Sequence, residues 1–471
     1  MAWLNARPGT RVALIGLVIA VLTPLLARAG LMTNYASLVM GKGVALAAAG
    51  LSLNLLMGYA GQISLGQASL LGVGAFASGA ITPADPSNPG MPFLVAIVVA
   101  AASGAAVAFL VGLPALRLRG LYLAVATIAF SFTMTESILK ANSIGGGSAG
   151  IALPRPQVNN FVFTRNGDYL GVLLALLALL WLLDTNVTRT TLGRAFRAIK
   201  SDEAVASSFG VDVTRYKLAA FALAGAMAGI AGLMSGHLVG TINSESFKYE
   251  ESLLLVVVVV VGGLGSRVGV LASAAFYALY PVIMPTIFGD GILGYDVVIG
   301  AAFLVSTMAR NPGGLAATFR EAIEQRKARK EPSVLIDTAE MPKLPALPRP
   351  TALAERTTGD GPVLRCDGIS VRYGGLTAVD DASLEVPRGK IVGLIGPNGA
   401  GKTTLFNALS GHLRPDAGRV ELLGRDVSDH GAAARAAAGL GRTFQNIGLV
   451  KDLSVTENML LAQHTVAGYD P

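Results

Sequence analysis

The sequence predicts an all-α polytopic membrane bundle followed by part of an α/β nucleotide-binding domain. Up to Ala309 the chain consists mostly of long apolar runs, and beyond Arg310 it is polar and charged. The 471 residues are 52% hydrophobic and only 14% charged, whereas a soluble domain has about 25% charged residues. A glycine-rich loop with phosphate-binding spacing lies in the polar part. We therefore predict a membrane domain at 1–310, a charged and then proline-rich cytoplasmic linker at 311–362, and a nucleotide-binding portion at 363–471.

Ten apolar segments predict about ten transmembrane helices. They lie near 11–28, 38–57, 64–81, 92–115, 120–139, 168–186, 218–238, 250–263, 269–287 and 292–309. Several approach the roughly 20 residues that cross a bilayer, whereas 250–263 is short enough to be tilted, extended or re-entrant. The first apolar segment begins with the basic residues Arg7 and Arg11, and a signal peptide begins in the same way. Its length, and the lack of a clean small-residue cleavage site, favour a transmembrane helix.

Basic residues indicate the orientation of the bundle. Ten crossings put both termini on one side, and that side carries Arg7, Arg11, Arg117, Arg119, Arg189, Arg194, Arg197, Lys200, Arg215, Lys217, Arg267 and Arg310. The other side, with its helix ends, carries Arg28, Lys42, Lys140, Arg155, Arg165 and Lys248. Because Lys and Arg accumulate in cytoplasmic loops, both termini are predicted to be cytoplasmic. The net charge of +7 has the same origin, and no basic stretch interleaved with aromatics indicates a nucleic-acid partner.

Polar side chains interrupt the apolar runs at a few positions. Gln62, Ser64 and Gln67 begin the third segment, and Glu136 lies near the outer end of the fifth. Lipid does not tolerate such groups unpaired, so we expect them to face the bundle interior or a water-filled path. They either form structural hydrogen bonds or line the path of a solute.

Two loops are long enough to contact other proteins. The outer loop at about 141–167 is either a partner contact or a plain connector. In the inner loop at 188–217, Ser201 is expected to cap a short exposed helix, with Asp202 and Glu203 in its first turn and Gly210 as its stop. A basic loop that only fixes orientation is the alternative to a docking helix.

The glycine-rich loop has the features of a nucleotide site. It reads GPNGAGKTT at 396–404, follows the apolar run Ile391–Ile395, which we predict to be a strand, and precedes a helix-forming stretch. Glycines let backbone N–H groups converge on a phosphate, and a helix N-terminus adds positive potential there. The predicted ATP contacts are Gly396, Asn398, Gly399, Gly401, Lys402, Thr403 and Thr404, with Lys402 reaching the β/γ-phosphates and the Thr403 hydroxyl on Mg²⁺. Alternating residues from Val363 onward predict an antiparallel sheet before this loop.

Four stretches resemble the permease of branched-chain amino acid ABC importers. They are GYAGQISLGQASLLGVGA (58–75), LRLRGLYLAVATIAFS (116–131), GRAFRAIKSDEAVASSFGVDVTRYKLAAFALAG (193–225) and VGGLGSRVG (261–269). The resemblance covers about 30–310 and implies a bundle that works as a pair of permeases. It also implies a coupling helix, which seats on the ATPase, at Glu203–Phe209. The coupling residues that it indicates are Glu203, Ala204, Val205, Ser207 and Phe209.

The segment after Val363 resembles the start of the ATP-binding subunit that partners this permease. The resemblance implies that Tyr373 stacks on adenine and that Gln445, in RTFQN (442–446), is the Q-loop residue that contacts Mg²⁺ or the attacking water. A strand-end tyrosine is the alternative for Tyr373. The family's signature motif, acidic strand with its catalytic Glu, and switch His lie beyond Pro471, and His412, His430 and His464 stand in the wrong context to replace that His. We therefore expect no ATP hydrolysis from these residues alone.

These features together predict an ATP-driven ABC importer subunit for branched-chain amino acids or similar small polar solutes, with permease fused to ATPase. Importers of urea or amides are an alternative, as is a membrane-anchored nucleotide-binding subunit that regulates without transporting. The expected partners are a second permease, a further ATPase subunit, an extracytoplasmic solute-binding protein and membrane lipid. The expected location is a bacterial-type cytoplasmic membrane. Cys366 is the single cysteine, which excludes an internal disulfide.

Overall fold

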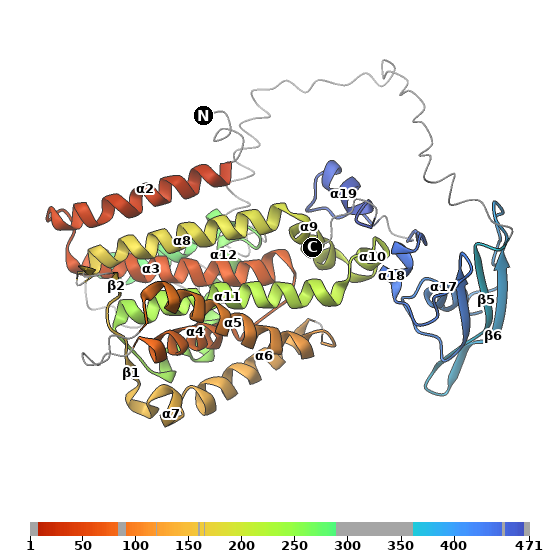
Figure 1. The fold of residues 1–471 in the computed structure, drawn as a ribbon, viewed down its shortest axis with the longest axis horizontal. Coiled ribbons are helices and arrows are strands. Elements are labelled where there is room, and N and C mark those ends of the chain that lie inside the picture. Colours follow the sequence, from red (N-terminus) through yellow and green to blue (C-terminus); the bar gives the residue numbers. More distant parts are fainter. Residues whose placement is uncertain are drawn as a thin grey trace, which may run out of the picture. The chain divides into compact units, whose positions relative to one another are not determined.

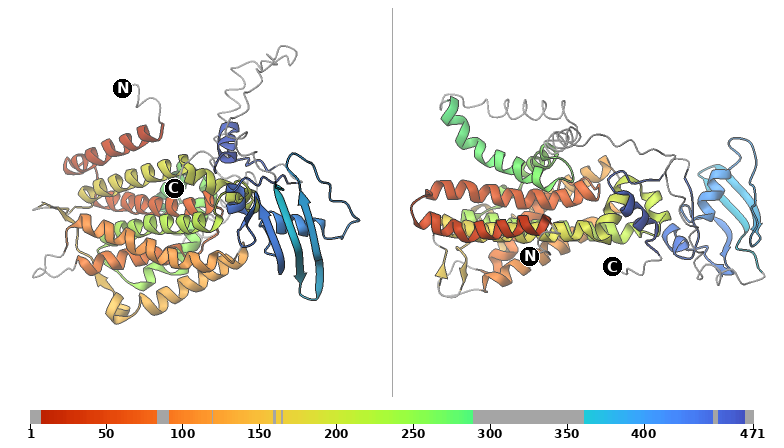
Figure 2. Two further views of the ribbon diagram at one scale, coloured as in Figure 1. Left: turned by 45° about the vertical axis from the view of Figure 1, so that its right-hand side comes forward. Right: turned by 90° about the horizontal axis from the view of Figure 1, so that it is seen from above.

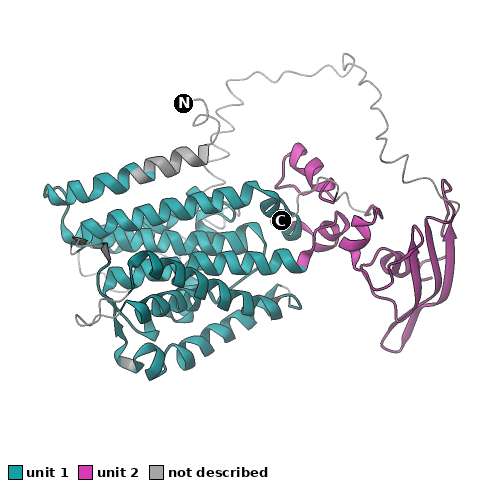
Figure 3. Cartoon of the chain, viewed as in Figure 1, with its two compact units in different colours: residues 1–200, 214–326 teal, residues 201–213, 327–471 magenta. Residues whose placement is uncertain are grey.

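The structure is a computed structural model, and it describes residues 8–82, 91–118, 120–158, 161–163, 165–288, 361–444 and 448–465. The chain divides into two compact units (Figure 3). Unit 1 comprises residues 1–200 and 214–326, and unit 2 comprises 201–213 and 327–471. The short segment 201–213 of the membrane half therefore belongs to the unit that carries the nucleotide loop. Nearly all of the predicted linker, at 311–360, lies outside the described residues.

Unit 1 is a bundle of helices (Figure 1). Its longer helices are α2 (Pro8–Arg28), α3 (Asn34–Leu53), α4 (Gln67–Ile81), α5 (Phe93–Ala115), α6 (Leu121–Thr133), α8 (Asn166–Arg189), α11 (Val213–Val239), α12 (Tyr249–Gly262) and α13 (Arg267–Phe288). Shorter helices of this unit include α7 (Asn142–Gly145) and α9 (Thr191–Ser201). Helix α8 packs against both α2 and α3, and α13 packs against α3 (Figure 2).

Within the described residues, each of the first nine predicted apolar segments contains a helix, and the tenth, 292–309, lies outside them. In the part of the chain that the structure describes, five helices are long and apolar enough to cross a membrane: Asn34–Tyr59, Phe93–Pro114, Leu121–Ile138, Asn166–Arg189 and Val213–Val239. The apolar segment at 250–263, which we expect to be short, corresponds to α12, a helix of 14 residues. The helical membrane-type domain is thus confirmed, and the count of ten crossings stays a prediction.

Close backbone approach between helices depends on glycine. A Cβ built on Gly104 of α5 would lie 2.2 Å from the carbonyl oxygen of Gly225 in α11, and one on Gly74 of α4 would lie 2.3 Å from the Cα of Gly229. No larger residue fits at these crossings without separating the helices, which is the packing that small-residue spacings favour in lipid. Buried polar groups also join helices: Arg267 of α13 pairs with Asp184 of α8.

Unit 2 contains an antiparallel sheet, as the alternating pattern predicts. The strands β5 (Leu364–Tyr373), β6 (Leu376–Val386), β7 (Ala417–Leu422) and β8 (Arg425–Asp426) are arranged in the order β6-β5-β7-β8. Strand β5 is central, since Leu364 pairs with both Val386 and Leu422. Helix α17 (Lys402–Leu409) packs on β5 and β6, and its buried Leu405 and Leu409 share a core with the inward residues of the sheet.

The prediction of a strand at Ile391–Ile395 is wrong for this structure. The run has no regular secondary structure, and Ile391 and Ile395 are almost fully exposed. An apolar run becomes a buried strand only when flanking strands accept its backbone hydrogen bonds. The described sheet pairs only antiparallel strands and places none beside this run.

Candidate functional site

The glycine-rich loop at 396–404 adopts positive φ angles at glycine positions, as a tight phosphate-binding turn requires. Gly399 has φ +86° and Gly401 has φ +80°, conformations that favour glycine. At Gly401 a Cβ would also lie 2.2 Å from the carbonyl oxygen of Ala378 in β6. Gly401 is the N-cap of α17, so the loop delivers its backbone directly to the start of a helix. Residues 391–400 are exposed, including Gly396 and Asn398, so this part of the loop is accessible to a phosphate ligand.

Polar side chains occupy the first turn of α17. The Lys402 ammonium donates to the carbonyl oxygens of Gly396 at 2.7 Å and Pro397 at 2.6 Å, so it lies over its own loop. Thr403 is exposed, and Thr404 is half-buried beside it. The structure therefore brings together the six predicted contacts from Gly396 to Thr403 within one loop and one helical turn. An ammonium and a hydroxyl there fit a nucleotide phosphate and a hard cation.

Tyr373 ends β5, immediately before a two-residue hairpin turn, and it is 52% exposed. Its partner across the hairpin is Leu376, two residues before the Ala378 that contacts Gly401. Since a strand advances about 3.4 Å per residue, the tyrosine pair lies about 7 Å along the strand from that contact. Tyr373 thus lies near the strand end closest to that contact, with the exposure that stacking on a base needs.

The predicted short helix is α10 (Glu203–Ser208), which matches the expected range. Its cap was assigned incorrectly, because Asp202, not Ser201, accepts hydrogen bonds from the backbone N–H groups of Ala204 and Val205, at 2.7 and 3.1 Å. Ser201 is the last residue of α9 and is unable to act as the cap. The predicted stop is confirmed: Gly210 follows the C-cap with φ +86°, and the N–H of Val211 donates to Ala206, as in a Schellman motif.

His412 contacts α10 from the nucleotide-binding segment. Its Nε2 lies 3.1 Å from the carbonyl oxygen of Ala204 and 3.1 Å from the Ser208 hydroxyl, with Ser207 Oγ at 3.4 Å. Because a carbonyl only accepts, this arrangement assigns the proton to Nε2 and leaves Nδ1 as an acceptor, 3.0 Å from Ser410 Oγ. One imidazole thus joins the end of α17 to α10.

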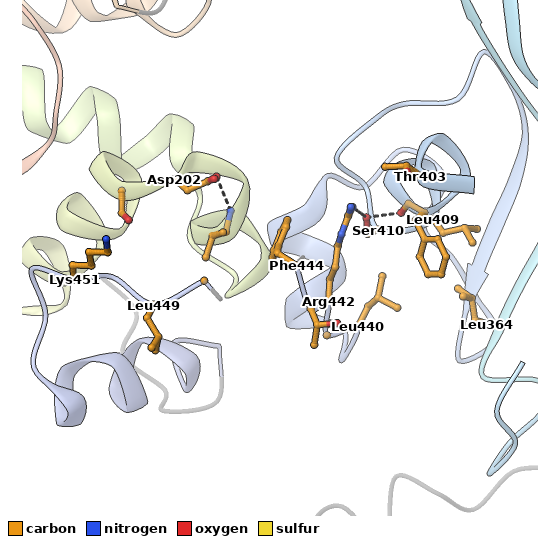
Figure 4. Close-up of a pocket in the computed structure, with 16 residues that line it drawn as sticks. Asp202, Leu364, Thr403, Leu409, Ser410, Leu440, Arg442, Phe444, Leu449 and Lys451 are labelled. Carbon is orange, nitrogen blue, oxygen red and sulfur yellow. Dashed lines mark hydrogen bonds between the residues drawn. The ribbon is translucent and has the colours of Figure 1, made fainter. Parts of the chain in front are cut away.

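A cavity of about 790 Å³ lies between these elements of unit 2. Figure 4 shows Arg442 extending toward Ser410, to whose hydroxyl it donates at 2.7 Å. The Arg442 guanidinium also lies over the Phe444 ring, 5.0 Å from its centroid, and Phe444 meets the His412 ring edge-on at 5.9 Å. On α10, Val205 is buried, and a Cβ on Gly448 would lie 2.9 Å from its side chain.

Gln445, the predicted Q-loop residue, lies outside the described residues. Of the coupling residues, Ala204, Val205 and Ser207 make the contacts above, and Glu203 and Phe209 lie at the two ends of α10. Sequence reasoning missed Ser208 and His412, which are about 200 positions apart and carry no local signal of contact.

The predicted solute-path residues do not converge. Gln67 is buried and donates to Ser52 Oγ at 2.8 Å, while its side-chain oxygen has no partner among the described residues. Gln62 donates to the backbone of Ala60, and Ser64 Oγ accepts weakly from Gly66 N–H at 3.4 Å. Glu136 pairs with Lys140, four residues along the chain. Gln62, Ser64 and Glu136 thus make local contacts, whereas Gln67 joins α4 to α3, and a role toward solute stays a prediction.

Comparison with known proteins assigns both parts of the chain. Residues 35–307 match the family model described as branched-chain amino acid transport system / permease component. Residues 379–469 match the family model described as ABC transporter.

Individual relatives give the same division. The high-affinity branched-chain amino acid transport system permease protein LivM of Salmonella typhimurium is 30% identical over 299 residues, which cover 58% of this chain and 68% of that protein. The ATP-binding protein BraF of Pseudomonas aeruginosa is 44% identical over 103 residues, and LivG of Salmonella typhimurium is 46% identical over 103 residues. Each of these two alignments covers 22% of this chain and 40% of the ATP-binding relative.

Proposed function

Because this chain belongs to the branched-chain amino acid transport system permease family and continues into an ABC transporter segment, we propose that it is a fused permease–ATPase subunit of an ABC importer. The solute class is branched-chain amino acids or chemically similar small solutes, which is the class named for its permease and ATP-binding relatives. The observation that carries the proposal is the direct contact of α10, from the permease sequence, with the nucleotide-binding segment through His412.

ATP is the proposed nucleotide. Its phosphates bind the loop from Gly396 to Gly401 and the start of α17, where Lys402 supplies a positive charge. Mg²⁺ is held by Thr403 together with Gln445, and it neutralises charge on the phosphates. Tyr373 stacks on the base, which its exposure at the end of β5 supports.

Helix α10 is the proposed coupling helix, and α17 connects it to the nucleotide. Lys402 begins α17 and His412 follows its end, so eight helical residues, about 12 Å long, separate the phosphate loop from the α10 contact. A displacement of α17 on nucleotide binding is therefore transmitted to Ala204 and Ser208 through one side chain.

The assembly contains a second permease, a further ATPase subunit and an extracytoplasmic solute-binding protein. The chain lies in the bacterial cytoplasmic membrane with about ten crossings. Both termini and the 188–217 loop are cytoplasmic, and 141–167 is external. The distribution of Lys and Arg supports this orientation, and so does the need of the nucleotide loop for cytoplasmic ATP.

Uptake by the source bacterium tests this proposal. Cells carrying a chromosomal Lys402→Ala substitution should lose ATP-dependent accumulation of radiolabelled leucine, whereas Lys390→Ala, at an exposed lysine before the loop, should leave it unchanged. Labelled urea and acetamide distinguish the other importer classes. Accumulation of leucine at the same rate in the Lys402→Ala strain and its parent would contradict the proposal.

A further inference from the structure

We propose that a cavity bounded by α3, α12 and α13 in unit 1 is a binding site for a small zwitterion with an apolar side chain, with Lys42 and Glu251 as its two charged groups. The cavity has a volume of about 440 Å³, within the range of small-molecule sites. The inference rests on the proposed function and names the residues by which the permease part would hold its solute.

The cavity wall on α3 is one face of the helix. Tyr35, Leu38, Val39, Lys42, Ala45, Leu46 and Ala49 all line it. Their spacing of three and four residues is that of a single helical stripe. Six of the seven are apolar or aromatic, so Lys42 is a single cation in the middle of an otherwise apolar wall. It lies eight residues into α3, about 12 Å from the start of the helix.

The opposite walls supply a carboxylate and further apolar surface. Glu251, Leu254 and Leu255 of α12 line the cavity at one face of that helix, and Tyr277, Ala278, Pro281 and Val282 of α13 do the same. Glu251 is the third residue of α12. Its neighbour Glu250 does not line the cavity, so of these two acids only Glu251 is in position to bind a ligand there.

The two charges are not used by the fold. Lys42 and Glu251 are both exposed, and among the described residues neither side chain forms an ion pair or hydrogen bond, whereas Glu136, Asp168 and Asp184 each pair with a basic side chain. An ionised group within a transmembrane bundle is costly and marks a path for polar solute unless it is paired.

The chemistry of the lining selects a ligand class. A cation and an anion in one cavity complement the α-carboxylate and α-ammonium of an amino acid, and each contact is a charge-assisted hydrogen bond. The remaining wall, with Leu38, Leu254 and Val282, complements a branched aliphatic side chain. Urea and simple amides offer hydrogen bonds but no charge, and would leave both Lys42 and Glu251 without a counter-charge.

The test uses chromosomal variants in the source bacterium and the initial rate of radiolabelled leucine uptake. Lys42→Met and Glu251→Gln should each lower the maximal rate at least tenfold. Lys42→Arg, which keeps the charge, should retain more uptake than Lys42→Met, and Glu250→Gln, which changes the neighbouring acid outside the cavity, should stay within about twofold of the parent. The double exchange Lys42→Glu with Glu251→Lys should recover more uptake than either single exchange, because it restores one charge of each sign.

The controls separate the site from the function. Immunoblots of the membrane fraction verify that each variant is inserted, and retention of uptake by Lys42→Arg shows that position 42 tolerates exchange. If the parent strain accumulates no leucine, the proposed function fails. If the parent accumulates leucine and both neutral variants transport at its rate, the binding site is refuted while the function stands.

Discussion

The Nε2 atom of His412 lies 3.1 Å from the carbonyl oxygen of Ala204, which joins the nucleotide-binding segment to a helix encoded within the permease sequence. The same nitrogen reaches the hydroxyl of Ser208, and the other ring nitrogen meets Ser410 at the end of α17. The imidazole therefore makes polar contacts with both α10 and the end of α17.

We expect His412→Ala to reduce transport per ATP hydrolysed. It removes the single Nε2–H donor that the Ala204 carbonyl and the Ser208 hydroxyl of α10 share, so the linkage weakens by about 1 kcal/mol. At 1.4 kcal/mol per factor of ten, uptake per ATP should fall about fivefold. Vesicle uptake and phosphate release, measured together in the assembled transporter, give this ratio.

The matched control is His430→Ala, at an exposed histidine of the same segment, which should leave the ratio unchanged. His412→Gln keeps a donor and an acceptor and should recover part of the loss. Unchanged coupling in His412→Ala would mean that the contact has no role in transmission.

A second prediction concerns the buried side of α10. Val205 is 8% exposed and packs closely on Gly448, where an added Cβ would lie 2.9 Å from the valine side chain. Val205→Asp buries a carboxylate without a partner, at a cost of several kcal/mol, and should separate α10 from the nucleotide-binding segment. ATP hydrolysis should continue in the assembled transporter while uptake falls at least tenfold.

Val205→Thr is the control for shape, because it adds a hydroxyl without a charge. It should lose far less uptake than Val205→Asp. Membrane amounts of both variants should equal that of the parent. Uptake at the parental rate in Val205→Asp would overturn the assignment of α10 as the coupling helix.

Local signals explain which parts of the structure were predictable from sequence. Long apolar runs are sufficient to form helices, so α3, α5 and α8 appear where predicted. Gly210 ends α10 because its conformation is local. Ser201 and Asp202 are both competent caps, and the choice depends on α9, which extends through Ser201 and leaves the cap to Asp202.

The remaining features depend on partners that a local pattern does not specify. The run Ile391–Ile395 has the composition of a strand, but a strand requires neighbours, and the described sheet provides none. From the sequence alone, Lys42 indicates only the orientation of the bundle. Its place in a cavity becomes visible once α12 and α13 are packed beside α3.

A third prediction tests the orientation of the bundle. With Cys366 replaced by Ala, single cysteines are introduced at Ser201, at the exposed end of α9, and at Ile144, which is 48% exposed in α7. A membrane-impermeant maleimide should label position 144 in intact spheroplasts and position 201 only after permeabilisation. Labelling of position 201 in intact spheroplasts would place the 188–217 loop on the external side of the membrane and refute the orientation.

The last prediction uses the single cysteine as a reporter on unit 2. Cys366 is 1% exposed, in β5, within the core formed by the sheet and α17. Burial raises the pKa of its thiol, because a thiolate there would lose its hydration. Only the thiolate reacts with maleimide. In the native protein at pH 7 the residue should therefore resist labelling for hours, and addition of urea should make it reactive at the rate at which the sheet unfolds.

The same shift predicts how stability depends on pH. An unfolded chain ionises this thiol near pH 8.5, whereas the folded chain keeps it protonated to a higher pH. The unfolded state then binds fewer protons above about pH 8.5, so the contribution of Cys366 is fully present below that pH and is lost as the pH rises toward the folded pKa. Urea midpoints for unfolding of unit 2, followed by tryptic cleavage between pH 7 and 10, should decline more steeply in the parent than in Cys366→Ala, which has no thiol to ionise. Equal slopes for the two proteins, or rapid native labelling at pH 7, would show that the β5 core opens far more readily than its burial implies.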